Sequence, residues 1–236
     1  NTYIYHSNDL NTLPQGYFCS KWRFKKKKLV YDSHEVQTSR TGYDSPVYGW
    51  LEKFFIKRID LMMVENATRA GYNEKLYGFY PHVVHNYPIP INVDHIEKTD
   101  LHTMLDLPKN EKILLYQGGI QEGRGLEHLV DAFPHFNEGT LLFIGDGKIK
   151  ERLIQKVKDK GLEEKIKFLP KVPLNELPSY TKNAYLGFQV LNNICFNHYS
   201  ASSNKLFEYM MSQVPVVACD FPEIKKVVEG EKVGVL

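Results

Sequence analysis

Short apolar runs alternate with segments of helical periodicity along this chain, and this alternation restricts the fold more than any other feature. The apolar runs lie at 3–6, 29–32, 61–65, 83–85, 113–117, 141–145, 166–169, 185–190, 214–219 and 233–236. Segments with helical periodicity lie at 46–59, 67–77, 125–136, 149–160, 174–183, 204–213 and 222–229. Strands that alternate with helices in this way build parallel sheets wrapped by helices. The sequence therefore predicts an α/β fold.

The segment HNYPIPINVD, residues 85–94, interrupts this alternation. Its two prolines disfavour helix at the residues that precede them, which is typical of a linker. With 236 residues, 42% of them apolar, the chain is large enough for two modest cores. We therefore expect one domain over 1–88 and a second over 89–236. Because both ends of the chain have strand character, we expect it to be a piece of a longer polypeptide.

Charge and cysteine content narrow the class of protein. A net charge of +2 provides no general surface for a polyanion, so nucleic acid is not an expected partner. Basic residues do cluster from Arg23 to Lys28, which indicates either the solvated end of a helix or a contact with an anionic membrane surface. Three cysteines without a CxxC pair predict neither a disulfide framework nor a zinc site. The few cysteines fit a reducing cytosol. No apolar run approaches the roughly 20 residues of a membrane-spanning helix, so we expect a soluble cytoplasmic protein, at most peripheral at the inner face of the membrane.

A glycine-rich turn follows the apolar run at 113–117. Gly118 and Gly119 permit a ligand to approach the backbone closely, and Arg124 stands where the next helix begins, able to hold phosphate oxygens. The same spacing fits a structural turn with a solvated arginine. In the GDG sequence at 145–147, Asp146 is more simply interpreted as a helix cap or a turn residue.

The segment SSNKLFEYMM, residues 202–211, predicts an anion site. Lys205 and Glu208 share one face of a helix near its amino end, where free N–H groups favour an anion. Ser202 and Ser203 are expected to cap that helix. The alternative is a surface salt bridge worth about 0.2 to 0.5 kcal/mol. Since an apolar strand follows directly, we favour buried surroundings and a site that holds a phosphate through Lys205 and adjacent hydroxyls through Glu208.

Polar side chains also follow two strands of the first domain. His6, Asn8 and Asp9 come after the run at 3–6, and His34 and Glu35 come after the run at 29–32. Open parallel sheets bind ligands at this edge, so these side chains are candidates for a second wall of a cleft. Turn and cap roles are the alternative for each of them.

Six segments occur in the order found in group 1 (family 4) retaining glycosyltransferases of the GT-B fold, and the chain resembles that family over nearly its whole length. The segments are NDLNTLP, YDSHE, HNYP, QGGIQEGRGLE, GDG and NKLFEYM followed by PVVA. The likeness is to bacterial enzymes that build surface polysaccharides. It implies two Rossmann-like parallel-sheet domains: residues 1–88 as the incomplete acceptor domain and 89–236 as the donor domain, lacking its final helix.

The resemblance also implies roles for individual residues. Glu208 resembles the carboxylate that holds the ribose hydroxyls, and the backbone of Lys171 and Val172 resembles the segment that touches the base. His6, or alternatively Asn8 or His34, resembles the histidine that faces the transferred sugar. The diphosphate would be held by Arg124, Lys205, the glycine-rich turn at Gly118 and Gly119, and the amides near Ser202 and Ser203.

The chain departs from the family pattern at two positions. Gly119 stands where the family has an arginine, and Ser200 stands where it has a glutamate eight positions before the second one. Lys205 is expected to compensate for the first change, because it brings one positive charge to the same oxygens. The second change leaves open which groups contact the donor sugar.

The implied activity is transfer of a sugar from a nucleoside diphosphate donor to a hydroxyl of a saccharide or lipid-linked acceptor, with retention of configuration. No metal and no cofactor are expected, and a fragment of this length is expected to retain donor binding at most. Two alternatives come from other classes of protein. One is a sugar-nucleotide epimerase of GT-B shape, and the other is a non-catalytic binding subunit.

Overall fold

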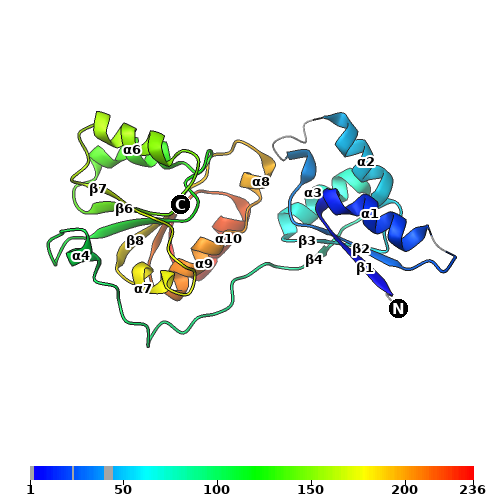
Figure 1. The fold of residues 1–236 in the computed structure, drawn as a ribbon, viewed down its shortest axis with the longest axis horizontal. Coiled ribbons are helices and arrows are strands. Elements are labelled where there is room, and N and C mark those ends of the chain that lie inside the picture. The colour runs from blue at the N-terminus through cyan, green and yellow to red at the C-terminus, as the bar shows by residue number, and fades with distance from the viewer. Residues whose placement is uncertain (1–2, 23, 40–44) are drawn as a thin grey trace. The chain divides into compact units, whose positions relative to one another are not determined.

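The computed structural model describes residues 3–22, 24–39 and 45–236, which form two compact units (Figure 1). Unit 1 comprises residues 1–86 and 194–202, and unit 2 comprises 87–193 and 203–236. The predicted boundary between residues 88 and 89 lies two residues from the observed division. The segment 194–202, expected with the second domain, packs instead with unit 1.

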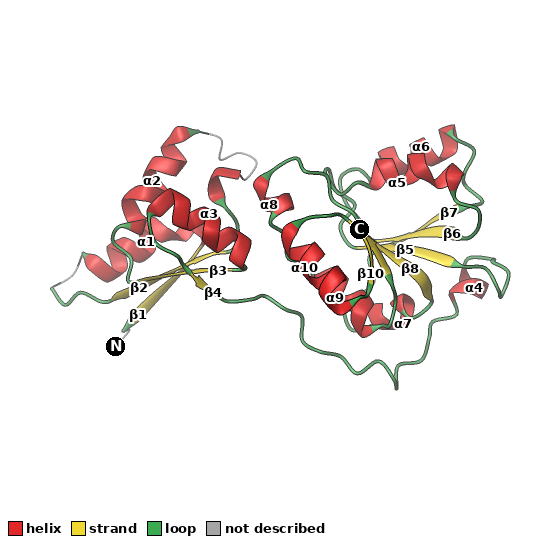
Figure 2. Ribbon diagram, turned by 180° about the vertical axis from the view of Figure 1, so that it is seen from behind, coloured by secondary structure: helices red, strands yellow, loops and turns green. Residues whose placement is uncertain are grey.

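Unit 1 is a parallel sheet with the strand order β1-β2-β3-β4. The strands are β1 (Ile4–Asn8), β2 (Lys28–Ser33), β3 (Leu61–Val64) and β4 (His82–Val83). They are joined by α1 (Asp9–Lys21), α2 (Pro46–Ile56) and α3 (Ala67–Tyr77), with a 3₁₀ turn η1 (Gln37–Ser39) after β2. Each strand is added on the same side of the one before it, and such crossovers are right-handed. The three helices therefore lie on one face of the sheet (Figure 2).

The core of unit 1 forms between the helices and the inward side chains of the strands. Leu13 of α1, Leu29 and Tyr31 of β2 and Met62 of β3 are almost fully buried there. The short helix α8 (Phe196–Tyr199) belongs to this unit. It is held by the stacked rings of Phe196 and Tyr72, whose centroids lie 4.2 Å apart, and by Asn197, whose side chain accepts from the amide of Val36 and donates to its carbonyl.

Unit 2 is a six-stranded parallel sheet with the order β10-β9-β8-β5-β6-β7. Its strands are β5 (Ile113–Gln117), β6 (Thr140–Ile144), β7 (Ile166–Leu169), β8 (Ala184–Gln189), β9 (Val216–Ala218) and β10 (Gly234–Val235). Its helical elements are α4 (Leu101–Met104), α5 (Leu126–Ala132), η2 (Phe133–His135), α6 (Lys150–Asp159), α7 (Leu177–Thr181), α9 (Asn204–Met211) and α10 (Pro222–Glu231). Helices α5 and α6 cover one face of the sheet, and α7, α9 and α10 cover the other (Figure 2).

Both faces of the central strands of unit 2 are buried. Every residue of β5 and β6 is buried, which explains their continuous apolar sequences. The structure has an α/β fold with parallel sheets, and each predicted strand is present. Within the described ranges, no helix is both long enough and apolar enough to cross a bilayer.

Candidate functional site

The strand order of unit 2 reverses between β5 and β8. From β5 the chain proceeds through β6 to β7, and it then returns to add β8 on the opposite side of β5. Open parallel sheets bind ligands outside the carboxyl ends of the strands at such a reversal. Gln117 ends β5, Gln189 ends β8, and the glycine-rich turn leaves the sheet between them. The topology therefore places a candidate site at this edge.

Lys205 in the first turn of α9 is buried beside this edge. Its Nζ lies 3.7 Å from the centroid of the Tyr116 ring, at the end of β5. A methyl group built on Gly118 would come within 3.6 Å of the same nitrogen, so the ammonium lies against the glycine-rich turn. Among the described residues Lys205 Nζ has no hydrogen-bond partner, although buried polar groups almost always have one.

The electrostatic surroundings of Lys205 disfavour its charged form. Burial lowers its pKa well below the ordinary value, and the positive charge of Arg124 lowers it further. Glu208 and Cys219 oppose the shift only in part. No ion pair joins Lys205 to Glu208, so the alternative of a surface salt bridge is wrong. A buried amine without a partner is suited to receive an anion that enters from outside.

Glu208 is held in place by a side chain that sequence reasoning missed. Gln117 Nε2 donates to Glu208 Oε2 at 2.7 Å, and Gln117 Oε1 accepts from Thr181 Oγ1 at 2.8 Å. Because both ends of the Gln117 amide are fixed, the carboxylate has one orientation and keeps its other oxygen for further donors. The only sequence signal for Gln117 was a polar residue at the end of an apolar strand.

Helix α9 is fixed against the sheet by Tyr209, another residue that the sequence did not single out. Its hydroxyl donates to the carbonyl of Leu115 at 3.0 Å and accepts from the amide of Gln117 at 3.2 Å. Its ring packs so closely on Gly187 that any side chain there would meet it at 2.8 Å. This contact determines where the first turn of α9, with Lys205, meets β5.

A cavity of about 420 Å³ lies beside Glu208 in unit 2. Its walls come from α7, α9 and the linker segment 88–93, and they are mostly apolar. The main apolar contributors are Ile89, Ile91, Leu174, Leu177, Pro178 and Met211. Glu208 and Asn204 add polar groups to the wall. An apolar enclosure with a carboxylate at its side can take a flat ring and bind hydroxyls attached to it.

The glycines of the GDG sequence have a structural role. A side chain on Gly145 would lie 2.0 Å from the carbonyl oxygen of Gly118, and one on Gly147 would lie 2.1 Å from that of Ile120. The two loops therefore need both glycines to pack together. Asp146 does not cap α6, because its carboxylate accepts from the amide of Lys171 at 3.0 Å and from Lys150.

The serines before α9 do not act as predicted. Ser203 is the N-cap residue, but its side chain accepts no hydrogen bond from the helix. Ser202 lies in unit 1, where its Oγ accepts from Asn66 Nδ2 at 3.2 Å. Ser200, at the position of the missing glutamate, is buried in unit 1 and accepts from Arg69 Nε at 3.1 Å. Ser202 therefore cannot cap α9, because it belongs to the segment 194–202 that packs with unit 1.

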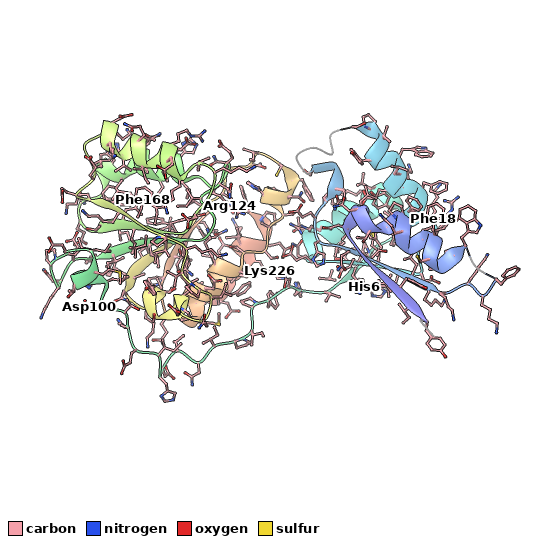
Figure 3. All side chains as sticks on the ribbon, viewed as in Figure 1. His6, Phe18, Asp100, Arg124, Phe168 and Lys226 are labelled. Carbon is pink, nitrogen blue, oxygen red and sulfur yellow. The ribbon has the colours of Figure 1, made fainter. Side chains whose placement is uncertain are left out.

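The remaining predicted residues of unit 2 border the turn and the loop after β7. Gly118 has φ of 121°, which glycine tolerates best, and Gly119 accepts a hydrogen bond from the Tyr116 hydroxyl. Lys171 is exposed and its amide is engaged by Asp146, whereas Val172 beside it is half-buried. Arg124 precedes the left-handed Gly125 that starts α5 (Figure 3).

The candidate residues of unit 1 surround Asp32 at the end of β2. Asp32 Oδ2 accepts from His6 Nε2 at 3.1 Å and lies 3.6 Å from His34 Nε2. Both imidazoles are about half exposed. Asn8 ends β1 in register with Asp32, but its side chain does not cap α1. In the described part of the chain, no group of three or more His, Cys, Asp or Glu residues is placed to hold a metal ion.

Comparison with known proteins shows which family the chain matches. The family described as glycosyl transferases group 1 matches residues 111–236. A protein of *Escherichia coli* K12 named as a colanic acid biosynthesis glycosyl transferase, WcaI, is 30% identical over 132 residues, which cover 54% of this chain and 31% of the relative. The chain thus spans about a third of that curated relative.

Solved structures agree with the fold of both units. Sucrose-phosphate synthase from *Thermosynechococcus elongatus* superposes with a TM-score of 0.74 at 18% identity, over 99% of this chain and 60% of that one. *Anabaena* Alr3699/HepE in complex with UDP gives a TM-score of 0.71 at 18% identity, over 99% and 64%. At these identities the likeness shows the fold, which is GT-B.

Proposed function

The chain belongs to the group 1 glycosyltransferases, and from this premise we propose that unit 2 binds a nucleoside diphosphate sugar whose sugar is transferred to an acceptor hydroxyl with retention. One observation carries the proposal. Lys205 is a buried amine that lacks a hydrogen-bond partner in the described part of the chain, at the strand reversal and against the glycine-rich turn. A diphosphate supplies the charge and the acceptor oxygens that this amine lacks.

The donor would lie across the carboxyl edge of the sheet. Its diphosphate meets Lys205, Arg124 and the amides of the Gly118 turn. Its ribose hydroxyls donate to the free oxygen of Glu208, and its base enters the apolar cavity near Val172. The UDP in the solved Alr3699/HepE complex supports a nucleotide as the ligand of this fold, although the base and the sugar for this chain stay open.

The chemistry follows from where charge develops. The bond between the anomeric carbon and the diphosphate oxygen breaks, and the nucleotide leaves with the bonding electrons. The acceptor oxygen bonds to the same carbon from the same face, and its proton passes to the departing phosphate oxygen. Fixed cations at the diphosphate stabilise this developing charge, so no protein nucleophile is required. In this proposal no metal or other cofactor takes part.

Unit 1 would supply the acceptor side. Asp32 orients the imidazoles of His6 and His34, and these groups, with Asn8, are candidates to face the transferred sugar. We propose a saccharide or lipid-linked saccharide as acceptor, in bacterial polysaccharide or glycoconjugate synthesis at the cytoplasmic face of a membrane. The name of WcaI supports this setting.

The test is binding of a panel of UDP-, GDP- and ADP-sugars by thermal shift and calorimetry. One member at 100 times its dissociation constant should stabilise the chain by about 2.7 kcal/mol. Glu208→Gln should weaken binding of that nucleotide and its nucleoside alike, by about tenfold to a hundredfold, since hydrogen bonds to charged groups contribute about 1.5–3 kcal/mol.

Glu163→Gln, on an exposed loop of the same unit, is the matched control and should bind like the parent. If no member of the panel stabilises the chain, the donor site is refuted. Following the bound donor by NMR separates the rival activities in a longer protein. An epimerase converts the donor without acceptor, and a non-catalytic subunit binds it without turnover.

A further inference from the structure

Unit 1 carries a row of aromatic rings that runs from the end of α1 to the outer side of α2. Successive ring centroids lie 5.2 to 5.8 Å apart. The order of the rings is Trp22, Phe18, Tyr17, Phe55, Phe54 and Trp50. Phe18, labelled in Figure 3, points outward from α1. These contacts link the exposed rings of α1 and α2 through Tyr17 and Phe55, so the two helices that carry the exposed rings pack against each other.

The rings at both ends of this row are exposed to solvent. Trp22 is 78% exposed and Trp50 is 65% exposed, while Phe55 between them is buried. Phe24, beyond the end of α1, is fully exposed. Large apolar side chains that gather on a surface mark an interaction site, because their exposure to water is unfavourable.

The charges beside these rings are positive. Residues 17–28 contain no acid, and Glu52 is the only acid between residues 46 and 59. Glu52 is buried and accepts hydrogen bonds from Tyr31 and Tyr77, so its charge does not reach this surface. Asp60, the next acid, is bound to Lys21 and Lys28.

The cations around the rings are mostly turned to solvent. Lys25 and Lys26 are exposed next to Phe24, and Lys53 and Lys57 are exposed on the turns of α2 that carry Trp50 and Phe54. Arg58 lies over the Phe54 ring at 3.7 Å. Arg23, which belongs to the basic run seen in the sequence, lies outside the described residues.

We propose that this aromatic and basic surface docks on a bilayer that contains anionic lipid. Phenylalanine rings have no hydrogen-bonding group, so they gain free energy only by entering an apolar phase. Tryptophan is suited to the boundary, where its ring is in the apolar layer and its N–H is in the polar one. The lysines then reach anionic headgroups, and each contributes about fivefold in affinity, the equivalent of about 1 kcal/mol. This docking does not depend on donor binding.

The chain offers a direct readout, because its two tryptophans are Trp22 and Trp50, both on this surface. Mixed with vesicles of phosphatidylglycerol and phosphatidylcholine, the full chain should sediment with the lipid and shift its fluorescence to shorter wavelength. Vesicles of phosphatidylcholine alone should give little binding. Raising salt from about 0.1 M to 1 M should weaken binding, since the Debye length falls from about 10 to 3 Å.

A single variant tests the aromatic part of the surface, and a double variant tests its basic part. Phe24→Ser should weaken vesicle binding by about tenfold, equivalent to about 1.5 kcal/mol for one buried ring. Lys25→Gln with Lys26→Gln should weaken it by about 25-fold. The control pair Lys109→Gln with Lys158→Gln removes the same charge from exposed positions of unit 2 and should bind like the parent.

Equal losses in the test and control pairs would mean a general charge effect and would overturn the proposal. So would a fluorescence shift with a soluble anionic polysaccharide and none with vesicles, which would assign the surface to a saccharide. Nucleotide binding measured on the same variants should be unchanged. Loss of vesicle binding with donor binding intact therefore distinguishes this site from the proposed donor site.

Discussion

The two units are both parallel sheets wrapped by helices, but the order of their strands differs. In unit 1 each strand is added beyond the last, and its three long helices cover one face. In unit 2 the order reverses at β5 and β8, and helices cover both faces. The reversal makes neighbouring loops diverge to opposite faces, which opens space at the strand ends. Strand order thus gives unit 2 a candidate ligand site that the same architecture in unit 1 lacks.

The two units also differ in whether their buried charged side chains have hydrogen-bond partners. Among the described residues, the buried charged side chains are Glu52 and Arg69 in unit 1 and Lys205 in unit 2. Glu52 accepts from two tyrosines, and Arg69 donates to Glu65, to Ser200 and to a backbone carbonyl. Lys205 has no such partner. A satisfied buried charge is explained by the structure around it, whereas an unsatisfied one is costly and makes Lys205 the candidate for ligand binding.

The largest expected effect is the loss of stability when the buried ion pair of Arg69 in unit 1 is removed. Arg69→Met removes the ion pair that Arg69 makes with Glu65, whose side chain is only 16% exposed. Removing one partner of a buried pair typically destabilises a protein by about 3–5 kcal/mol. Urea unfolding followed by tryptophan fluorescence measures it, because both tryptophans lie in unit 1. Lys28→Met, which removes an exposed pair with Asp60, should cost less than about 1 kcal/mol. Similar losses for both variants would contradict the comparison.

Lys205→Met should have the opposite effect on stability. It replaces a buried amine that lacks a described hydrogen-bond partner by an apolar chain of similar length. The free energy of opening of the β5 amides, measured by hydrogen exchange, should therefore rise by about 1 kcal/mol or stay unchanged. Affinity for a nucleoside diphosphate should fall by about tenfold to a hundredfold, because a hydrogen bond to a charged group is lost. Affinity for the nucleoside alone should persist. Faster exchange in this variant would mean that Lys205 stabilises the fold as Arg69 does, and it would contradict the difference inferred between these two buried residues.

The pH dependence of donor binding sharpens the comparison further. In the free protein the pKa of Lys205 is lowered by burial and by Arg124, with Glu208 and Cys219 acting in the other direction. A bound diphosphate raises that pKa, so at a pH between the free and bound pKa values the complex takes up as much as one proton on binding. Affinity should therefore rise as pH falls between the two pKa values, by at most about tenfold per pH unit.

Calorimetry in buffers of different ionisation enthalpy measures how many protons are taken up when the donor binds. A sugar nucleotide is the suitable ligand, because the terminal phosphate of a free diphosphate itself titrates near pH ~6. Lys205→Met should abolish the proton uptake while Lys158→Met keeps it. Equal uptake in both variants would assign the proton to another group.

Local pattern predicted most of the secondary structure but not all of it. The strands follow from apolar runs between turn residues, because burial on both faces needs continuous apolar sequence. Helix α1 was less evident, since Pro14 and Gly16 interrupt its periodicity. Helices α4 and α8 have only four residues each, too few to show a helical period.

The main residues of the candidate site could be predicted from the sequence, but the residue that holds Glu208 in place could not. The spacing of Lys205 and Glu208 on one helix face was visible in the sequence. The amide of Gln117 that fixes Glu208 comes from a residue 91 positions away, so no local pattern announces it. The capping predicted for Ser202 and Ser203 was wrong. Ser202 packs with unit 1, and Ser203, although it is the N-cap residue of α9, accepts no hydrogen bond from the helix through its side chain.

The sequence by itself determined which segments are strands, which helix carries an amine and a carboxylate one turn apart, and which family the motifs resemble. The tertiary structure alone decided that the amine is buried without a partner while the other buried charges are satisfied. Periodicity is a property of neighbours along the chain, whereas burial and pairing depend on which distant strands lie side by side. For that reason the reversal between β5 and β8, and the buried amine beside it that lacks a hydrogen-bond partner among the described residues, could be found only in the folded chain.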